Sequence, residues 1–382
     1  MTSGLREQFE IDFRDPSAVD KISAILIEYG VVVVTNVFEK DECDRNVSRI
    51  VDAYEILSGD FKRTDFSTWD KKVLPPGPRD GLSQFMISNL PVVSDVRSDP
   101  RVRQVFSAAY GGTRGCTITD FLSSNDGINL RPPKAPYYDP STPDWAHVDN
   151  AIKDAEKYKI IQGQAVMTST SACFRCSPKS HLIHDYLLEK FSTYEAEWCK
   201  FENENYKEIC EKIQSVGGEW QIPIIVPIGS MILWFSETVH SACIQSPPGT
   251  MDLVDGEWKD WRCVIYVCLR PADELGEEHR FRLRNSYRKN RTTNHSGQKL
   301  FGAIPTNQKH TKFSERIRSF MKNPELVYSI FPPSKNPEWL KMLGFPDGKI
   351  DEDLWAEDIR KEKEILDARH LERTGVAFKR SE

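Results

Sequence analysis

Two residues separated by one position, His147 and Asp149, are the strongest candidates for chemistry in this sequence. On a β-strand, residues i and i+2 project from the same face, so an imidazole nitrogen and a carboxylate oxygen can face a common point. A second imidazole, His240, lies far downstream. Two imidazoles and one carboxylate form a donor set that suits Fe(II) and leaves coordination positions open. We therefore predict His147, Asp149 and His240 as catalytic metal ligands, although the first could be a loop histidine and the last a core histidine.

The composition is that of a soluble globular chain with a small negative charge. The 382 residues include 51 Lys and Arg against 57 Asp and Glu, a net charge of −6, which makes general nucleic-acid binding an unlikely main task. No apolar run is long enough to span a bilayer, and Met1–Glu7 lacks a signal-peptide core. Nine cysteines without a regular framework favour reduced thiols, so we expect a cytoplasmic protein with no membrane partner. The glycosylation sequons at Asn46, Asn290 and Asn294 are then chance matches.

Apolar residues upstream of the His-Asp pair recur at helical spacing in three segments, and a β-branched run follows the first of them. We predict helices over 16–29, 39–57 and 99–110, a strand over Val31–Thr35, and a loop over 72–81 that is rich in proline and glycine. Gly30 should end the first helix and Gly111-Gly112 the third, because glycine tolerates the left-handed conformation of a helix end.

Short apolar segments dominate the middle of the chain. They predict strands over 116–122, 127–130, 160–170, 172–176, 220–228, 231–235 and 261–269. Helical periodicity with dense charge returns at 314–321 and 351–373. A helix, a strand and a helix followed by many short strands favour a β core of two sheets with helical additions.

Five segments, in order, resemble the Fe(II)/2-oxoglutarate dioxygenases of the phytanoyl-CoA dioxygenase type. The segment "EYGVVVVTNVFEKDEC" from Glu28 is similar to that family's helix–strand–helix opening, and "HVDN" at His147 matches its His-X-Asp pair. The segment "ACFRCSPKSH" resembles its strand and turn, with Lys179 in place of glycine. The segment "VPIGSMILWFSETVHSA" is similar to the one that carries the distal histidine, with Ser230 in place of aspartate. The closing strand, which carries the 2-oxoglutarate arginine, resembles "WRCVIYVCLR".

The resemblance implies a fold that is mainly β with α additions. We expect a double-stranded β-helix (jelly roll) with an N-terminal α/β cap and a C-terminal helical extension. All of residues 1–382 would form a single oxygenase domain. Its parts would be a cap at 1–115, a core at 116–270 with a helical insert at 182–218, and an extension at 271–382.

The resemblance also implies the chemistry. In this family the two histidines and the carboxylate hold Fe(II), and 2-oxoglutarate takes two of the open positions. Its oxidative decarboxylation to succinate and CO2 accompanies hydroxylation of an unactivated C–H bond. Asp149 favours hydroxylation or a related oxidation, because halogenating relatives lack this carboxylate. The expected cofactors are Fe(II) and 2-oxoglutarate, with ascorbate as a candidate reductant, and the expected substrate is an unidentified small molecule.

The distal carboxylate of 2-oxoglutarate suits a bidentate arginine. We predict Arg262 for this contact rather than Arg270, because Arg262 enters an apolar strand, where a buried charge needs an anionic partner. Arg270 precedes Pro271, where the strand leaves the core. A hairpin insertion over 247–259 accounts for the long interval between the distal histidine and Arg262. Gln164 is a weaker candidate for a second contact to the co-substrate.

Three further patterns carry other interpretations. His181 matches a turn histidine of the family whose role is structural. Cys173 and Cys176 have redox-motif spacing, but the surrounding strand pattern favours a buried structural role. The basic cluster at 280–291 could bind an anionic ligand, CoA-like or nucleic acid, or form a solvated face or an exposed edge strand.

Two other functions fit the same residues. A jelly roll without activity could serve as a binding or structural module, and a cupin-type isomerase or hydrolase could use another divalent metal. The intact set of His147, Asp149 and His240, together with the candidate Arg262, argues against the first. Arg262 argues against the second, because a 2-oxoglutarate enzyme has the clearest need for a buried cation.

Overall fold

The computed structural model describes most of the chain. The described residues are 6–69, 73, 82–83, 87–133, 145–152, 156, 159–192, 197–244, 246, 252–301, 315, 318–319 and 332–374. The predicted loop at 72–81 and the predicted helix at 314–321 therefore lie almost wholly outside the described residues, as does part of the predicted hairpin at 247–259. Its described part, from 252 on, consists of turns and irregular backbone. Among the described helices, none combines the length and the apolar character needed to cross a membrane.

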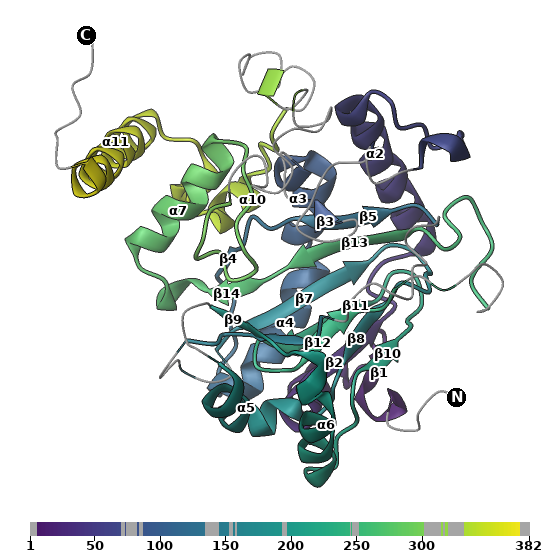
Figure 1. The fold of residues 1–382 in the computed structure, drawn as a ribbon. Coiled ribbons are helices and arrows are strands. Elements are labelled where there is room, and N and C mark those ends of the chain that lie inside the picture. Colours follow the sequence, from purple (N-terminus) through teal and green to yellow (C-terminus); the bar gives the residue numbers. More distant parts are fainter. Residues whose placement is uncertain are drawn as a thin grey trace.

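Two large sheets form the centre of the molecule (Figure 1). The seven-stranded sheet has the order β1 (Glu10–Asp12), β2 (Val31–Thr35), β11 (Met231–Phe235), β7 (Ile161–Val166), β13 (Arg262–Val267), β5 (Ile128–Arg131) and β3 (Leu82–Ser83). The five-stranded sheet has the order β10 (Ile222–Ile224), β8 (Phe174–Cys176), β12 (His240–Ala242), β6 (His147–Asp149) and β9 (Trp198–Lys200). A small two-stranded sheet pairs β14 (Leu269–Pro271) with β4 (Phe121–Ser123).

The chain passes repeatedly from one large sheet to the other. Strands β5, β7, β11 and β13 lie in the seven-stranded sheet, and β6, β8, β10 and β12 in the five-stranded one. Apolar side chains from both sheets meet in one cluster, which includes Val166, Ile232 and Val264 from the first and Phe174 and Ile224 from the second. This alternation is the connectivity expected of a jelly roll, and the shared apolar layer is what holds two sheets face to face.

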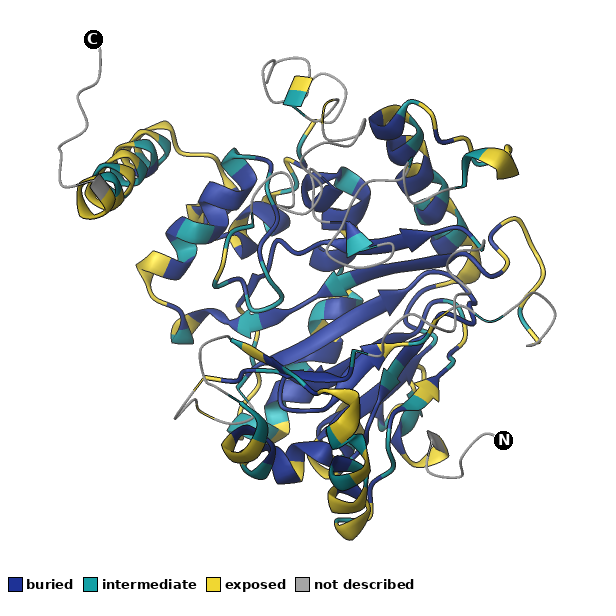
Figure 2. Ribbon diagram, viewed as in Figure 1, coloured by how far each residue is buried: buried dark blue, intermediate teal, exposed yellow. Residues whose placement is uncertain are grey.

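The valine run of β2 shows how sequence and packing agree. Val31 and Val33 face the layer between the two sheets, whereas Val32 and Val34 face the helices on the other side of the large sheet. Both faces of β2 are therefore buried, which explains a continuous apolar run rather than an alternating one. Figure 2 shows that the central strands of the large sheet are also buried over most of their length.

Helices cover the outer face of the large sheet and surround the core. They are α1 (Ala18–Tyr29), α2 (Lys40–Ser58), α3 (Pro91–Ser98), α4 (Pro100–Arg114), α5 (His184–Phe191), α6 (Tyr206–Ser215), α7 (Glu277–Arg288), α10 (Pro337–Met342) and α11 (Glu352–Thr374). Short 3-10 turns lie at Arg6–Phe9, Phe66–Thr68, Ile87–Asn89, Ser180–Ile183, Asn203–Asn205, Ala272–Glu274 and Pro346–Gly348. The molecule is thus mixed α/β with two large sheets, which is more helical than a mainly β fold.

Three local predictions need correction. Helix α4 continues through Gly111 and Gly112 and ends at Gly115, whose φ is 67°. A Cβ on Gly112 would lie 1.9 Å from the Ser23 hydroxyl of α1, so this glycine permits close helix packing and does not terminate the helix. The insert at 182–218 is not wholly helical, because β9 pairs with β6 at the edge of the smaller sheet.

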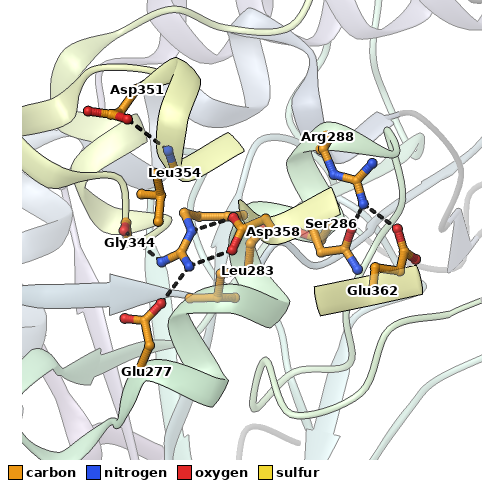
Figure 3. Close-up of polar contacts among 11 residues, drawn as sticks. Glu277, Leu283, Ser286, Arg288, Gly344, Asp351, Leu354, Asp358 and Glu362 are labelled. Atoms are coloured by element: carbon orange, nitrogen blue, oxygen red, sulfur yellow. Dashed lines mark hydrogen bonds and ion pairs between the residues drawn. The ribbon is translucent and has the colours of Figure 1, made fainter. Parts of the chain in front are cut away.

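The basic cluster at 280–291 is also not an edge strand, because most of it lies on helix α7. Arg284 is buried, and its guanidinium binds both carboxylate oxygens of Asp358 on α11, at 2.7 and 2.8 Å (Figure 3). Arg288 and Lys289 both pair with Glu362, one turn farther along α11. These three cations attach α11 to α7, and so they are neutralised by carboxylates of the chain itself.

Candidate functional site

The structure brings the three predicted metal ligands together. Strands β6 and β12 are antiparallel neighbours, and His147 and His240 are directly paired across them. The two imidazole rings lie 4.2 Å apart between centroids, and Asp149 Oδ2 lies 3.7 Å from His240 Nε2. One ligand atom from each of the three residues lies within 4.8 Å of the others. The arrangement could hold one metal ion on the inner side of the smaller sheet.

Each histidine is oriented by the backbone just before it. The Nδ1 atom of His147 lies 2.9 Å from the Trp145 carbonyl oxygen, and that of His240 lies 2.9 Å from the Thr238 carbonyl oxygen. With Nδ1–H donating to a carbonyl, the lone pair is on Nε2, the nitrogen that faces Asp149 in the case of His240. Such a second hydrogen bond fixes the tautomer and ring orientation of metal-binding histidines.

The electrostatics favour the protonation states that bind metal. Burial, followed by the neighbouring His147, lowers the pKa of His240 to about 3, so its imidazole is neutral at physiological pH. Burial alone would raise the pKa of Asp149, but His147, His240, His295 and the hydrogen bond from Gln162 together hold that pKa below its ordinary value. A neutral imidazole and an ionised carboxylate are the ligand forms that a divalent cation requires.

Gln162 is a supporting residue that the sequence analysis missed. It precedes Gln164 by two positions on β7, and its Nε2 donates to Asp149 Oδ2 at 2.8 Å. Because residues i and i+2 share a face of a strand, Gln162, Gln164 and Val166 form a row on the inner face of β7. Strand alternation could have identified Gln162, because it lies two positions before Gln164, which the sequence already indicated.

Arg262 and Gln164 lie at the same narrow cavity between the sheets, which Thr168, Cys173 and Val264 also line. The Arg262 side chain is almost wholly buried, and its Nη1 donates to the Ala172 carbonyl. Within the part of the chain that the structure describes, Arg262 Nε and Gln164 Oε1 are buried without a hydrogen-bond partner.

Arg270 occupies a different place. It lies on β14, opposite Leu122 of β4 in the small sheet, and it is absent from the residues that line the cavity of Arg262. His181 is also apart from the metal ligands, because its Nε2 donates to the Ile27 carbonyl of α1 at 3.0 Å.

A second histidine–aspartate pair lies beside the three ligands. His295 Nδ1 is 2.6 Å from Asp126 Oδ2, and Asp126 is buried. The His295 ring stands edge-on to Tyr266 at 4.8 Å and to Trp234 at 6.0 Å between centroids. Burial opposes the charge on His295, but Asp126 and then Asp149 raise its pKa above the ordinary value. In the sequence, His295 follows Asn294 inside a chance glycosylation sequon, and no spacing rule connects it with Asp126.

Comparisons with known proteins give weak sequence matches and structural matches of low sequence identity. No family model matches the chain. A Dictyostelium discoideum protein described as "Putative phytanoyl-CoA dioxygenase" is 26% identical over 137 residues, which cover 34% of this chain and 35% of that protein. The chain thus spans about a third of that relative's length. The Aspergillus versicolor "Ava biosynthesis cluster protein O" is 20% identical over 250 residues, or 62% of this chain and 77% of that protein.

One similar solved structure is the GlcNAc Inducible Gene 2 protein from Candida albicans, with a TM-score of 0.51 and 12% sequence identity. It covers 92% of this chain and 88% of the other, and it shows a shared fold alone. The chain therefore resembles proteins of the phytanoyl-CoA dioxygenase type, as its sequence predicted.

Proposed function

We propose that the protein is an Fe(II)- and 2-oxoglutarate-dependent oxygenase of the jelly-roll type, and that it hydroxylates a small-molecule substrate. One observation carries this proposal: His147, Asp149 and His240 converge with both Nδ1 atoms engaged by backbone carbonyls. A site with two imidazoles and one carboxylate on one side leaves the opposite coordination positions for co-substrate and oxygen.

The residues present fit Fe(II). His147 and His240 would each supply Nε2, and Asp149 a carboxylate oxygen whose orientation Gln162 controls. When bound, the iron supplies the oxidising chemistry that couples decarboxylation of 2-oxoglutarate to hydroxylation of a C–H bond. The protein then has to orient both organic molecules and exclude water from all but one side of the centre.

Arg262 would hold the distal carboxylate of 2-oxoglutarate. Its guanidinium is buried in a cavity, and its Nε lacks a hydrogen-bond partner among the described residues, which is costly unless an anion binds there. Gln164 lines this cavity and lies two positions from Gln162 on β7, so its amide would contact the middle of the bound molecule. Two positions on a strand span about 7 Å, so the row from Gln162 to the cavity has the scale of a five-carbon diacid.

The primary substrate would approach from the side on which the site is open to solvent. The Asp149 side chain is 26% exposed and that of His295 24%. Trp198, whose ring stands edge-on to His147, is 42% exposed. These residues come from β6, β9 and the segment after α7. Substrate contacts would therefore come from the insert and from the C-terminal part of the chain.

Anaerobic titration with Fe(II) and 2-oxoglutarate tests the proposal. The wild type should develop the visible charge-transfer band of an iron–oxoacid chelate, and His240→Ala should not. In air, with ascorbate as reductant, the wild type should form succinate slowly even without a primary substrate. Binding of 2-oxoglutarate without succinate formation across a broad substrate panel would favour an inactive binding module instead. Equal metal binding by the wild type and His240→Ala would show that the metal site is wrong.

A further inference from the structure

Two cysteines face each other at the wall of the Arg262 cavity. Cys173 precedes β8 and Cys243 follows β12, and the two sulfur atoms lie 3.7 Å apart. The register of these strands pairs Ala242 with Phe174, so the next pair along the ladder is Cys243 with Cys173. The Cys243 amide donates to the Cys173 carbonyl at 2.9 Å, which confirms that the two residues are opposite each other.

Cross-strand neighbours have the backbone separation that a disulfide requires. Directly opposite residues in a hydrogen-bonded antiparallel pair have Cα atoms about 5.5 Å apart, within the range of about 4.4–6.8 Å that disulfides span. The sulfur atoms need to approach from 3.7 Å to a bond length of about 2.05 Å, which takes rotation about the two Cα–Cβ bonds and a small approach of the two strand ends.

The surroundings favour reaction at Cys243. The Cys173 thiol donates to the Cys243 sulfur, and this hydrogen bond is the main reason why the pKa of Cys243 lies below its ordinary value despite burial. Arg175, Arg262 and Arg131 lower the same pKa further. Cys243 is also partly exposed whereas Cys173 is buried, so an oxidant reaches Cys243 first. A thiolate near cations with a second thiol in contact is the arrangement of a redox-sensitive pair.

We propose that Cys173 and Cys243 form a reversible disulfide when the protein meets a peroxide, and that this bond alters the Arg262 cavity. The Cys243 thiolate attacks one peroxide oxygen, which becomes the hydroxyl of a sulfenic acid, while the other leaves as hydroxide and takes up a proton to form water. The Cys173 sulfur then attacks the Cys243 sulfur, loses its proton, and displaces the hydroxyl as a second water. Two thiols are oxidised, and one hydrogen peroxide is reduced to two molecules of water.

The link to the cavity is covalent and short. Cys173 itself lines the cavity, and the carbonyl of the residue before it, Ala172, accepts the hydrogen bond from Arg262. Drawing Cys173 toward Cys243 changes the lining of the cavity and shifts the adjoining Ala172 carbonyl, which supports Arg262. This second part rests on the proposed function, because it makes the affinity for 2-oxoglutarate depend on the redox state of the pair.

Mass spectrometry of the full chain tests the disulfide without reference to activity. The wild type is treated with hydrogen peroxide, alkylated under denaturing conditions without reductant, and digested. We expect a cross-linked peptide containing Cys173 and Cys243, a mass loss of two hydrogens, and reversal by dithiothreitol. Cys173→Ser should instead give a Cys243 sulfenic acid that dimedone traps. The matched control Cys116→Ser removes an exposed cysteine and should leave the cross-link unchanged.

Two results would overturn the proposal. The first is oxidation of the wild type that yields no Cys173–Cys243 peptide, and the second is a cross-link that leaves the affinity for 2-oxoglutarate unchanged. We expect a several-fold weaker affinity in the oxidised wild type and no change in peroxide-treated Cys173→Ser/Cys243→Ser. A cross-link in a protein that binds no 2-oxoglutarate in either redox state would refute the proposed function and support the disulfide itself.

Discussion

The metal-ligand cluster and the arginine cluster of α7 are both groups of ionisable side chains, yet their hydrogen bonds are arranged in opposite ways. In the first, a backbone carbonyl accepts a hydrogen bond from Nδ1 of each histidine. One ligand atom from each of the three residues then faces a common point. In the second, the Arg284 guanidinium donates to both carboxylate oxygens of Asp358, and both side chains are almost wholly buried. The first arrangement has the geometry of a cation site, whereas the charges of the second are paired within the chain.

Burial of a charged side chain does not by itself identify a ligand-binding site. Arg284 and Arg262 are both almost wholly buried. Arg284 has its carboxylate partner in the fold, so its role is to join α7 and α11. Arg262 has one backbone acceptor and an Nε without a partner among the described residues, and under the proposed function its complement is the distal carboxylate of 2-oxoglutarate.

Removing a predicted ligand should have the largest effect. His240→Ala takes one of three donors from the metal site, so we expect affinity for Fe(II) to fall by more than about 100-fold, beyond the loss typical of outer-shell changes. Succinate formation should fall to background. Isothermal titration under anaerobic conditions measures the affinity for Fe(II), and chromatography measures the succinate formed. If His240→Ala kept the wild-type affinity for Fe(II), His240 would not be a metal ligand, and the cluster would have a structural role like that of the arginine cluster.

Breaking the arginine cluster should affect stability and leave the metal site intact. Arg284→Met leaves Asp358 buried without its cation, which costs about 3–5 kcal/mol of unfolding free energy. Chemical denaturation measures this cost, and Fe(II) titration of the folded variant should match the wild type. The double variant Arg284→Met/Asp358→Leu removes both charges and should recover most of the loss. If the single variant unfolds like the wild type, Arg284 does not stabilise the docking of α11.

A variant of Arg262 tests whether this buried arginine binds an external ligand, in contrast to Arg284, which pairs within the chain. Arg262→Ala should weaken 2-oxoglutarate binding by about 2–4 kcal/mol, the cost of removing one member of a desolvated ion pair. Arg270→Ala is the matched control, because Arg270 lies outside the cavity and should leave the 2-oxoglutarate requirement near that of the wild type. Steady-state assays over a range of 2-oxoglutarate concentrations distinguish them. A large effect of Arg270→Ala with none for Arg262→Ala would reverse the assignment.

The sequence predicted those parts of the fold and site that depend on local pattern. The bounds of β2 and β11 follow from continuous apolar runs, and the shared face of His147 and Asp149 follows from strand alternation. Gln162 could also have been found from this rule, because it lies two positions from Gln164.

The remaining features depend on contacts between distant segments. Asp126 and His295 are far apart in the sequence, and their pairing depends on where the segment after α7 lies. The strand β9 is similar, because it forms only by pairing with β6. The arginine cluster of α7 was open to a strand interpretation because the alternation of arginines with Phe281 and Leu283 is consistent with a period of two. Pairing with Asp358 and Glu362, about 70 residues later, favours the helix, since residues at positions i and i+4 of both helices then meet.

The smallest expected effect concerns His181, a buried histidine to which we assign a structural role. Burial lowers its pKa from 6.5 to about 4, so the folded protein holds it neutral while the unfolded chain takes up a proton below pH 6.5. Its contribution to stability is therefore complete above pH 6.5 and is lost as pH falls toward 4, by up to about 3 kcal/mol. His181→Gln keeps an amide donor for the Ile27 carbonyl but cannot titrate. The difference in unfolding free energy between wild type and variant should shrink by this amount over the same interval, measured by denaturation at several pH values. A constant difference would mean that His181 does not change its protonation on unfolding. Because His181 lies apart from the metal ligands, Fe(II) affinity at neutral pH should be equal in the two proteins.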